Sequence, residues 1–209
     1  MSKKETWEKV WKNQRKNRGL FDRVLWKLRH STSRNYAEKI SKMLEGKPKP
    51  KILEVGCGSA VTFIYLRKKI PDAELVGLDF SPAALKLAEK RNKGCKFIEG
   101  DAKKMPFGSG KFDFVYSLGL IEHFSREVAL QIVKEHARAA KEGGIVMIVV
   151  PAKYSLIHMA RVVAGNKWPF GYEEAFGKQE LLEVMRKAGL KHIRIERLKT
   201  IIYLATGMK

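Results

Sequence analysis

From residue 51 onward, short apolar runs alternate with segments whose apolar residues recur at helical spacing. Strands are predicted at the runs KILEV, AELVGLD, CKFIEGD, FDFVYSL, IVMIVVP, KHIRIERL and IIYLAT. Between them, the spacing predicts helices at about 60–69, 81–91, 126–144, 154–163 and 178–188, the third closed by Gly143 or Gly144. Strands that alternate with helices indicate an α/β protein whose mostly parallel sheet is covered on both faces.

The first 50 residues have a different pattern, with apolar stripes at helical spacing and no strand signal. Trp7, Val10 and Trp11 form one stripe, and residues 20–28 form a second. The run HSTSRNYAEKISKMLEG at 30–46 predicts a further helix with Ser or Thr as its cap and Gly46 as its stop. We therefore expect an N-terminal helical cap or lid at 1–50 and a main domain at 51–209, in one globular unit.

The chain has 209 residues and a formal net charge of +20, which is unevenly distributed. Residues 1–51 hold 16 Lys/Arg against 5 Asp/Glu, whereas residues 52–150 hold 15 against 12. A basic segment attracts anionic partners such as RNA, although lysines also simply solvate a surface. The chain begins without the apolar region of a signal peptide and contains no apolar run of membrane-spanning length, so we expect a cytoplasmic protein.

The two cysteines, Cys57 and Cys95, lack the spacing of a metal site or a redox pair. We therefore expect reduced thiols and no metal.

Polar residues and glycines follow the predicted strands at the point where each strand ends. Because the carboxyl ends of parallel strands meet at one edge of a sheet, they should gather there and form a ligand site. They are Glu54 with the Gly56-Cys57-Gly58 turn, Asp79, Asp101 and the SLG run at 117–119. Glycines let a backbone approach a ligand closely, and Asp79, 21 residues after Gly58, suits the two hydroxyls of a ribose.

A dinucleotide is the first candidate for this ligand, but the run Gly56-Cys57-Gly58-Ser59-Ala60-Val61 lacks the third glycine of that fingerprint. Glu54, two residues before the turn, would repel a diphosphate and attract a cation. A nicotinamide-dependent oxidoreductase and a non-catalytic adenosyl-ligand-binding module stay open at this point.

The motifs LEVGCGSA, LVGLDFSPAALKLAEKR, FIEGDAKKMPF and FDFVYSLGLIEHF, in this order and spacing, resemble those of the class I S-adenosylmethionine-dependent methyltransferases. The similarity is greatest to the small-molecule branch that includes quinone-methylating enzymes. It covers residues 50–152 and implies a Rossmann-like, doubly wound, seven-stranded sheet with S-adenosylmethionine as cofactor. The cationic ammonium and sulfonium of that cofactor would explain Glu54.

The resemblance also implies roles for individual residues. Glu54, Gly56, Cys57 and Gly58 would lie along the methionine and ribose portions, Asp79 on the ribose, and Phe80 on the adenine. Asp101 would accept from the adenine amine, Ala102 and Met105 would line the adenine slot, and Ser117 and Leu118 would meet the methionine group. Ala60 stands where the family more commonly has a third glycine, and we expect its methyl to tighten the turn without abolishing binding.

The acceptor is less well defined by the sequence. Candidates for a general base are His123, Tyr172 and Glu173, followed by Glu122 and Tyr36. The aromatic residues Trp168, Phe170, Tyr172 and Phe176 suggest an apolar pocket or a lid. We expect a small-molecule acceptor, with RNA methylation through the basic N-terminal segment as the alternative, and the sequence leaves the oligomeric state open.

Overall fold

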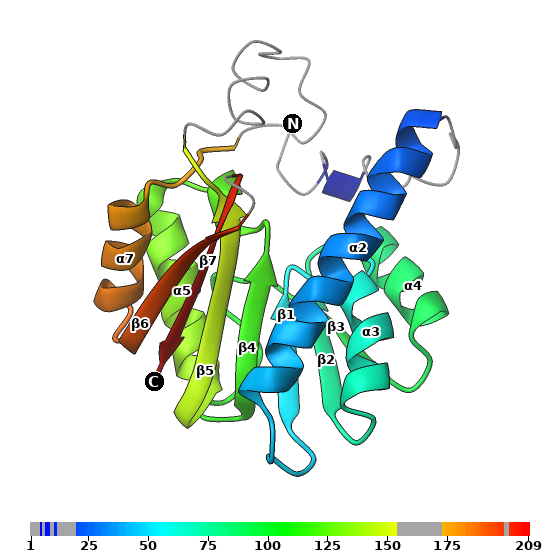
Figure 1. The fold of residues 1–209 in the computed structure, drawn as a ribbon, viewed down its shortest axis with the longest axis horizontal. Coiled ribbons are helices and arrows are strands. Elements are labelled where there is room, and N and C mark those ends of the chain that lie inside the picture. Colours follow the sequence, from blue (N-terminus) through cyan, green and yellow to red (C-terminus); the bar gives the residue numbers. More distant parts are fainter. Residues whose placement is uncertain (1–4, 6, 9–10, 12–19, 154–172, 199–200) are drawn as a thin grey trace. The chain divides into compact units, whose positions relative to one another are not determined.

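The computed structural model describes residues 5, 7, 8, 11, 20–153, 173–198 and 201–209, with only the backbone of residues 20–26. These residues include seven strands, which form a sheet in the order β3-β2-β1-β4-β5-β7-β6 (Figure 1). The chain divides into two compact units, Met1–Glu99 and Gly100–Lys209, which we call the first and second halves. The predicted Rossmann-like, mostly parallel seven-stranded sheet is confirmed, whereas the division at residue 50 stays a prediction.

In the first half, three parallel strands and the helices α2, α3 and α4 have defined bounds among the described residues (Figure 1). Strands β1 (Lys51–Val55), β2 (Glu74–Asp79) and β3 (Lys96–Glu99) pair in parallel, with Leu53 opposite Val76. Four of the five residues of β1 are buried, as is typical of a parallel strand covered on both faces. Helices α2 (Leu20–Met43), α3 (Val61–Lys69) and α4 (Pro82–Arg91) pack in sequence, α2 on α3 and α3 on α4.

The long helix α2 corrects the prediction of two separate helices with a Ser or Thr cap near residue 31. It runs without a break through this region. The hydroxyl of Thr32 donates to the carbonyls of Leu28 and Arg29, both at 3.0 Å, so it bonds back into the helix instead of starting a new one. Further along, Tyr36, Ala37, Ile40 and Leu44 are buried, and this apolar face explains why the helix continues.

The second half contains β4 (Phe112–Leu118), the short 3-10 helix η1 (Ile121–His123), α5 (Arg126–Ala139) and β5 (Ala140–Pro151). Among the described residues of this half, these elements are followed by helix α7 (Lys178–Lys187) and by strands β6 (Lys191–Leu198) and β7 (Ile202–Met208). Strand β4 pairs in parallel with β5, and β7 pairs antiparallel with both β5 and β6. Helix α5 packs on β4, β5 and α7 (Figure 1).

The end of α5 also differs from the prediction. The helix stops at Ala139, not at Gly143 or Gly144, and Ala140 already pairs with Phe112 as part of β5. The amide of Gly143 donates to the Lys209 carbonyl at 3.1 Å, and the Lys209 amide donates to the Gly144 carbonyl at 3.1 Å. These partners are distant in sequence, which is why helical spacing alone extended the helix too far.

The helix expected at 154–163 lies outside the described residues. Within the part of the chain that the structure describes, no helix is both long enough and apolar enough to cross a membrane.

Candidate cofactor and acceptor sites

The glycine turn after β1 is held against the end of β2. The amides of Gly56 and Cys57 both donate to the Leu78 carbonyl, at 2.7 and 3.0 Å. Gly56, Gly58 and Ala60 have φ angles of 69°, 54° and 47°, so the turn places three residues in the left-handed region. Only the glycines enter this region without strain, which explains their use here.

The Asp79 carboxylate, predicted to bind a ribose, also closes this turn. Its Oδ2 accepts from the Gly58 amide at 2.8 Å, and its Oδ1 accepts from the Ser81 amide at 2.9 Å. Each oxygen keeps a second lone pair for a ligand hydroxyl. Burial raises the pKa of the Asp79 carboxyl above its usual value, and these backbone hydrogen bonds oppose the shift. Asp79 therefore fixes the glycine turn and remains chemically suited to a diol.

Glu54 and Cys57 are buried beside this turn. Burial, followed by the nearby Glu54 and Asp79 carboxylates, raises the pKa of the Cys57 thiol well above its ordinary value. The thiol donates weakly to the Gly58 carbonyl at 3.7 Å, so it is a neutral packing group and not a nucleophile. Phe80 follows Asp79 and is half-buried.

The N-terminal segment contacts these residues in a way that the sequence did not reveal. Carbon Cζ2 of Trp11 lies 2.6 Å from the position that a Cβ on Gly58 would take, and an Arg29 guanidinium nitrogen lies 3.4 Å from it. The Ser81 hydroxyl, which caps α4, donates to Glu8 Oε2 at 2.5 Å. The helical stripe containing Trp7 and Trp11 was a signal for a lid, but nothing distinguished Arg29 from the other basic residues.

In the second half, the predicted adenine-slot residues lie on the turn after β3. Asp101 is exposed, and its Oδ1 accepts from the Lys103 amide at 2.9 Å. Ala102 is half-buried and Met105 is buried. Its Oδ2 lies 3.2 Å from the Lys103 Nζ, so Asp101 shapes its own turn through both oxygens.

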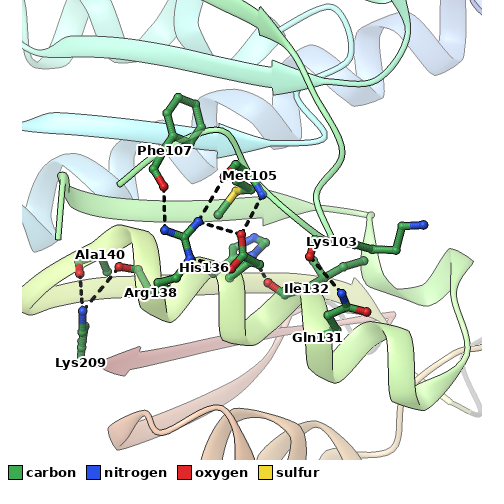
Figure 2. Close-up of polar contacts among 10 residues, drawn as sticks. Lys103, Met105, Phe107, Gln131, Ile132, His136, Arg138, Ala140 and Lys209 are labelled. Atoms are coloured by element: carbon green, nitrogen blue, oxygen red, sulfur yellow. Dashed lines mark hydrogen bonds and ion pairs between the residues drawn. The ribbon is translucent and has the colours of Figure 1, made fainter. Parts of the chain in front are cut away.

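This turn is fastened to α5 by two residues that the sequence analysis missed (Figure 2). Glu135 Oε2 accepts from the Met105 amide at 2.7 Å. The Arg138 guanidinium donates to the Phe107 carbonyl at 2.6 Å and to the Met105 carbonyl at 3.2 Å, and it pairs with Glu135 at 2.6 Å. The hydrogen bond from Arg138 lowers the pKa of the Glu135 carboxyl. The only local signal was an acidic and a basic residue three positions apart, which is common on helices.

Ser117 and Leu118 end β4, with Ser117 fully buried. The next residue, Gly119, has φ of 67°, and its amide donates to the Val149 carbonyl of β5 at 2.9 Å. A Cβ on Gly119 would lie 3.2 Å from Glu122 Oε1, so the Glu122 side chain turns back over the strand end.

Three of the candidate general bases lie on two adjacent segments at η1. Glu122 and His123 are buried there, and so is Glu173, 50 residues further along the chain. The Glu174 amide donates to the Glu122 carbonyl at 2.7 Å, which brings Glu173 next to the segment that carries His123. Tyr172, Trp168 and Phe170 lie outside the described residues, and Tyr36 is buried on α2 in the first half.

Arg126 holds the segment containing Glu173 in place from the start of α5. Its guanidinium donates to the carbonyls of Glu174 at 3.2 Å and Ala175 at 2.8 Å, and it lies 3.7 Å from the centre of the Phe176 ring. The amide of Phe176 donates to the Pro151 carbonyl at 3.1 Å. The predicted pocket residue Phe176 is thus fully buried and anchors the segment to the end of β5.

Comparisons with known proteins agree with this geometry. Residues 52–144 match a family described as a methyltransferase domain. A demethylmenaquinone methyltransferase from Chlorobaculum tepidum is 34% identical over 175 residues, covering 74% of this chain and 71% of that protein. One from Staphylococcus carnosus is 32% identical over 220 residues, covering 93% of this chain and 89% of that protein. The chain belongs to the class I S-adenosylmethionine-dependent methyltransferases.

The fold of this methyltransferase is shared with a solved S-adenosylmethionine-dependent methyltransferase from Thermotoga maritima. The TM-score is 0.71 at 19% identity, and the match covers 100% of both chains. The sequence of the glycine turn was compared with that of dinucleotide-binding proteins as well as with that of the methyltransferases. Family membership decides between these ligands, and the cofactor is S-adenosylmethionine. The first-half residues fit it, because Asp79 has lone pairs for a diol and the buried Glu54 carboxylate suits a cationic ligand.

Proposed function

We propose that this methyltransferase acts on a small apolar acceptor of the quinol type and that Glu54, Gly56, Cys57, Gly58, Asp79, Phe80, Asp101, Ala102, Met105, Ser117 and Leu118 hold its cofactor. The acceptor class is supported by the two demethylmenaquinone methyltransferases to which the chain is similar. When bound, S-adenosylmethionine supplies a methyl group that its sulfonium already activates. The protein therefore has to position the acceptor, exclude water and remove a proton.

The observation that carries this proposal is the hydrogen bond from the Glu174 amide to the Glu122 carbonyl at 2.7 Å. It brings Glu173 and His123, two groups that can take a proton, to adjacent segments, and both are buried. A quinol loses one proton for each methyl group that it receives, whether the new bond forms at oxygen or at a ring carbon. A buried base that receives this proton is the group that such an acceptor requires.

The test is a transfer assay with methyl-labelled S-adenosylmethionine and a short-chain naphthoquinol that lacks the ring methyl. We expect label in the organic phase with the reduced quinol and none with the oxidised quinone, which has no hydroxyl proton to lose. Host RNA is offered in a parallel reaction. Label that nuclease releases from RNA, or no label in the quinol, would overturn the acceptor class.

Variants then assign the proton acceptor. His123→Asn and Glu173→Gln should each be compared with Glu174→Gln as the control. The Glu174 side chain lies beside Arg126, with its Oε1 3.7 Å from Nη2 of Arg126. Loss of a general base should lower kcat by a factor on the order of 100 or more without a matching change in KM. Equal rates for both base variants and the control would show that neither group takes the proton.

A further inference from the structure

The Arg29 guanidinium reaches the cofactor turn from helix α2. One of its terminal nitrogens lies 3.4 Å from the position of a Cβ on Gly58, and its central carbon lies 5.3 Å from the centre of the Trp11 ring. The helix is fixed at this point, because the ring Nδ1 of the next residue, His30, hydrogen-bonds the Tyr65 hydroxyl of α3 at 2.8 Å. Arg29 is therefore part of the wall beside the glycine turn.

The surroundings of this guanidinium favour an anion. Burial lowers the pKa of Arg29, Glu54 raises it, and Arg91 lowers it again. The group stays protonated at neutral pH, since an arginine is effectively always charged. Among the described residues, no oxygen accepts a hydrogen bond from it, and its contact there is the face of Trp11. Arg29 is half-buried, and a partly desolvated cation without a hydrogen-bond acceptor is unfavourable, which a carboxylate ligand would relieve.

We propose that Arg29 binds the α-carboxylate of the methionine portion of the cofactor. This inference rests on the cofactor-binding role proposed above for Glu54 and Gly58. The methionine portion is a zwitterion, and the turn is flanked by the buried Glu54 carboxylate and the half-buried Arg29 guanidinium. Glu54 matches the ammonium and Arg29 the carboxylate, which the planar guanidinium binds through two parallel hydrogen bonds.

Trp11 has a supporting role in this arrangement. Its ring edge lies against Gly58, and the Arg29 guanidinium lies over the ring. An aromatic face holds a guanidinium in place and leaves its edge free to donate hydrogen bonds. The N-terminal segment would thus complete the methionine end of the site through Arg29, without direct use of its other basic residues.

The experiment compares two probes that differ only in the group that Arg29 is proposed to bind. S-adenosylmethionine and its decarboxylated analogue share the sulfonium, the ammonium and the adenosine. Titration calorimetry should show the wild-type protein binding S-adenosylmethionine about 10- to 100-fold more tightly. In Arg29→Met this preference should fall below about threefold, while affinity for the decarboxylated analogue should change little.

The controls separate this inference from the assignment on which it rests. Arg34→Met removes an exposed arginine from the same helix and should keep the wild-type preference. Arg29→Lys keeps the charge without the paired geometry, so an intermediate preference is expected, and it tests the inference if Arg29→Met does not fold. An unchanged preference in both Arg29 variants would overturn the proposal and leave cofactor binding intact. Failure of the wild type to bind either probe would instead overturn the cofactor site itself.

Discussion

The indole ring of Trp11 lies directly on the backbone of Gly58, the second glycine of the cofactor turn. A Cβ on Gly58 would be 2.6 Å from Cζ2 and 2.7 Å from Cη2 of the ring, closer than side-chain carbons approach one another. The φ angle of Gly58 is 54°, so an L side chain would be strained there even without the ring. Two independent physical reasons therefore select glycine at this position.

We expect Gly58→Ala to lower the free energy of unfolding through both effects. The left-handed backbone costs about 1–2 kcal/mol for alanine, and displacement of the ring costs about 1–3 kcal/mol more. In a protein that carries Trp11→Ala, the ring is absent, so Gly58→Ala should have only the backbone cost. A double-mutant cycle by urea unfolding should therefore give a coupling of about 1 kcal/mol or more between the two changes.

The matched control for this cycle is Gly94→Ala. Gly94 has φ of 84° and nothing within 4 Å of the position of its Cβ. Gly94→Ala should therefore lower the free energy of unfolding by the backbone cost alone and should show no coupling to Trp11→Ala. Additive effects of Gly58→Ala and Trp11→Ala would show that the ring does not rest on the turn in solution.

Ala60 occupies the same turn with φ and ψ both at 47°, at the position where a third glycine would be free of strain. Ala60→Gly removes a strain of about 1–2 kcal/mol. It also loses a buried methyl worth about 0.8 kcal/mol and adds a backbone entropy cost of about 0.5–1 kcal/mol. These terms nearly cancel, so we expect a change in unfolding free energy near zero.

Ala88→Gly is the comparison for Ala60→Gly, because Ala88 is also fully buried but lies inside helix α4. It should cost about 2 kcal/mol, from helix propensity and the lost methyl together. Chemical unfolding of both variants checks the difference. A loss at Ala60 as large as that at Ala88 would show that the turn is not strained.

The cofactor turn and the residues around it illustrate what the sequence could and could not predict. The cofactor turn and the Ser81 cap of α4 follow from local patterns, and both were predicted. The strain at Ala60 and the approach of Trp11 depend on residues brought together by folding. Likewise, the end of α5 is determined by the pairing of Ala140 with Phe112, which no local pattern contains.

The Arg138 side chain is expected to support the cofactor site from a distance, through the turn that carries Met105. Arg138→Ala removes its hydrogen bonds to the carbonyls of Phe107 and Met105. We expect a loss of about 2 kcal/mol in unfolding free energy. Binding of S-adenosylhomocysteine should weaken by roughly tenfold, equivalent to about 1.4 kcal/mol.

Calorimetry and thermal unfolding separate these two effects of Arg138→Ala. Lys134→Ala, at an exposed position on the same helix, should change neither. A variant that is destabilised but binds S-adenosylhomocysteine normally would remove Met105 and its turn from the predicted adenine slot.

His136 should make the stability of the protein sensitive to mild acid. Its Nδ1 hydrogen-bonds the Ile132 carbonyl at 2.8 Å (Figure 2), and its Nε2 is buried without a partner among the described residues. Burial lowers its pKa from 6.5 to about 4. In the unfolded chain His136 is therefore protonated below about pH 6.5, whereas in the folded protein it stays neutral down to about pH 4. Stability falls as the pH drops through this window, by about 3 kcal/mol in full.

His136→Leu should remove this contribution, so its unfolding free energy should decline less between pH 7 and 4.5 than that of the wild type. Urea unfolding across this range measures the difference in slope. His192→Asn is the control, because His192 is exposed and its φ of 50° is one that asparagine tolerates. Its curve should run parallel to the wild type. A parallel curve for His136→Leu as well would mean that the folded protein accommodates a protonated His136, contrary to its burial.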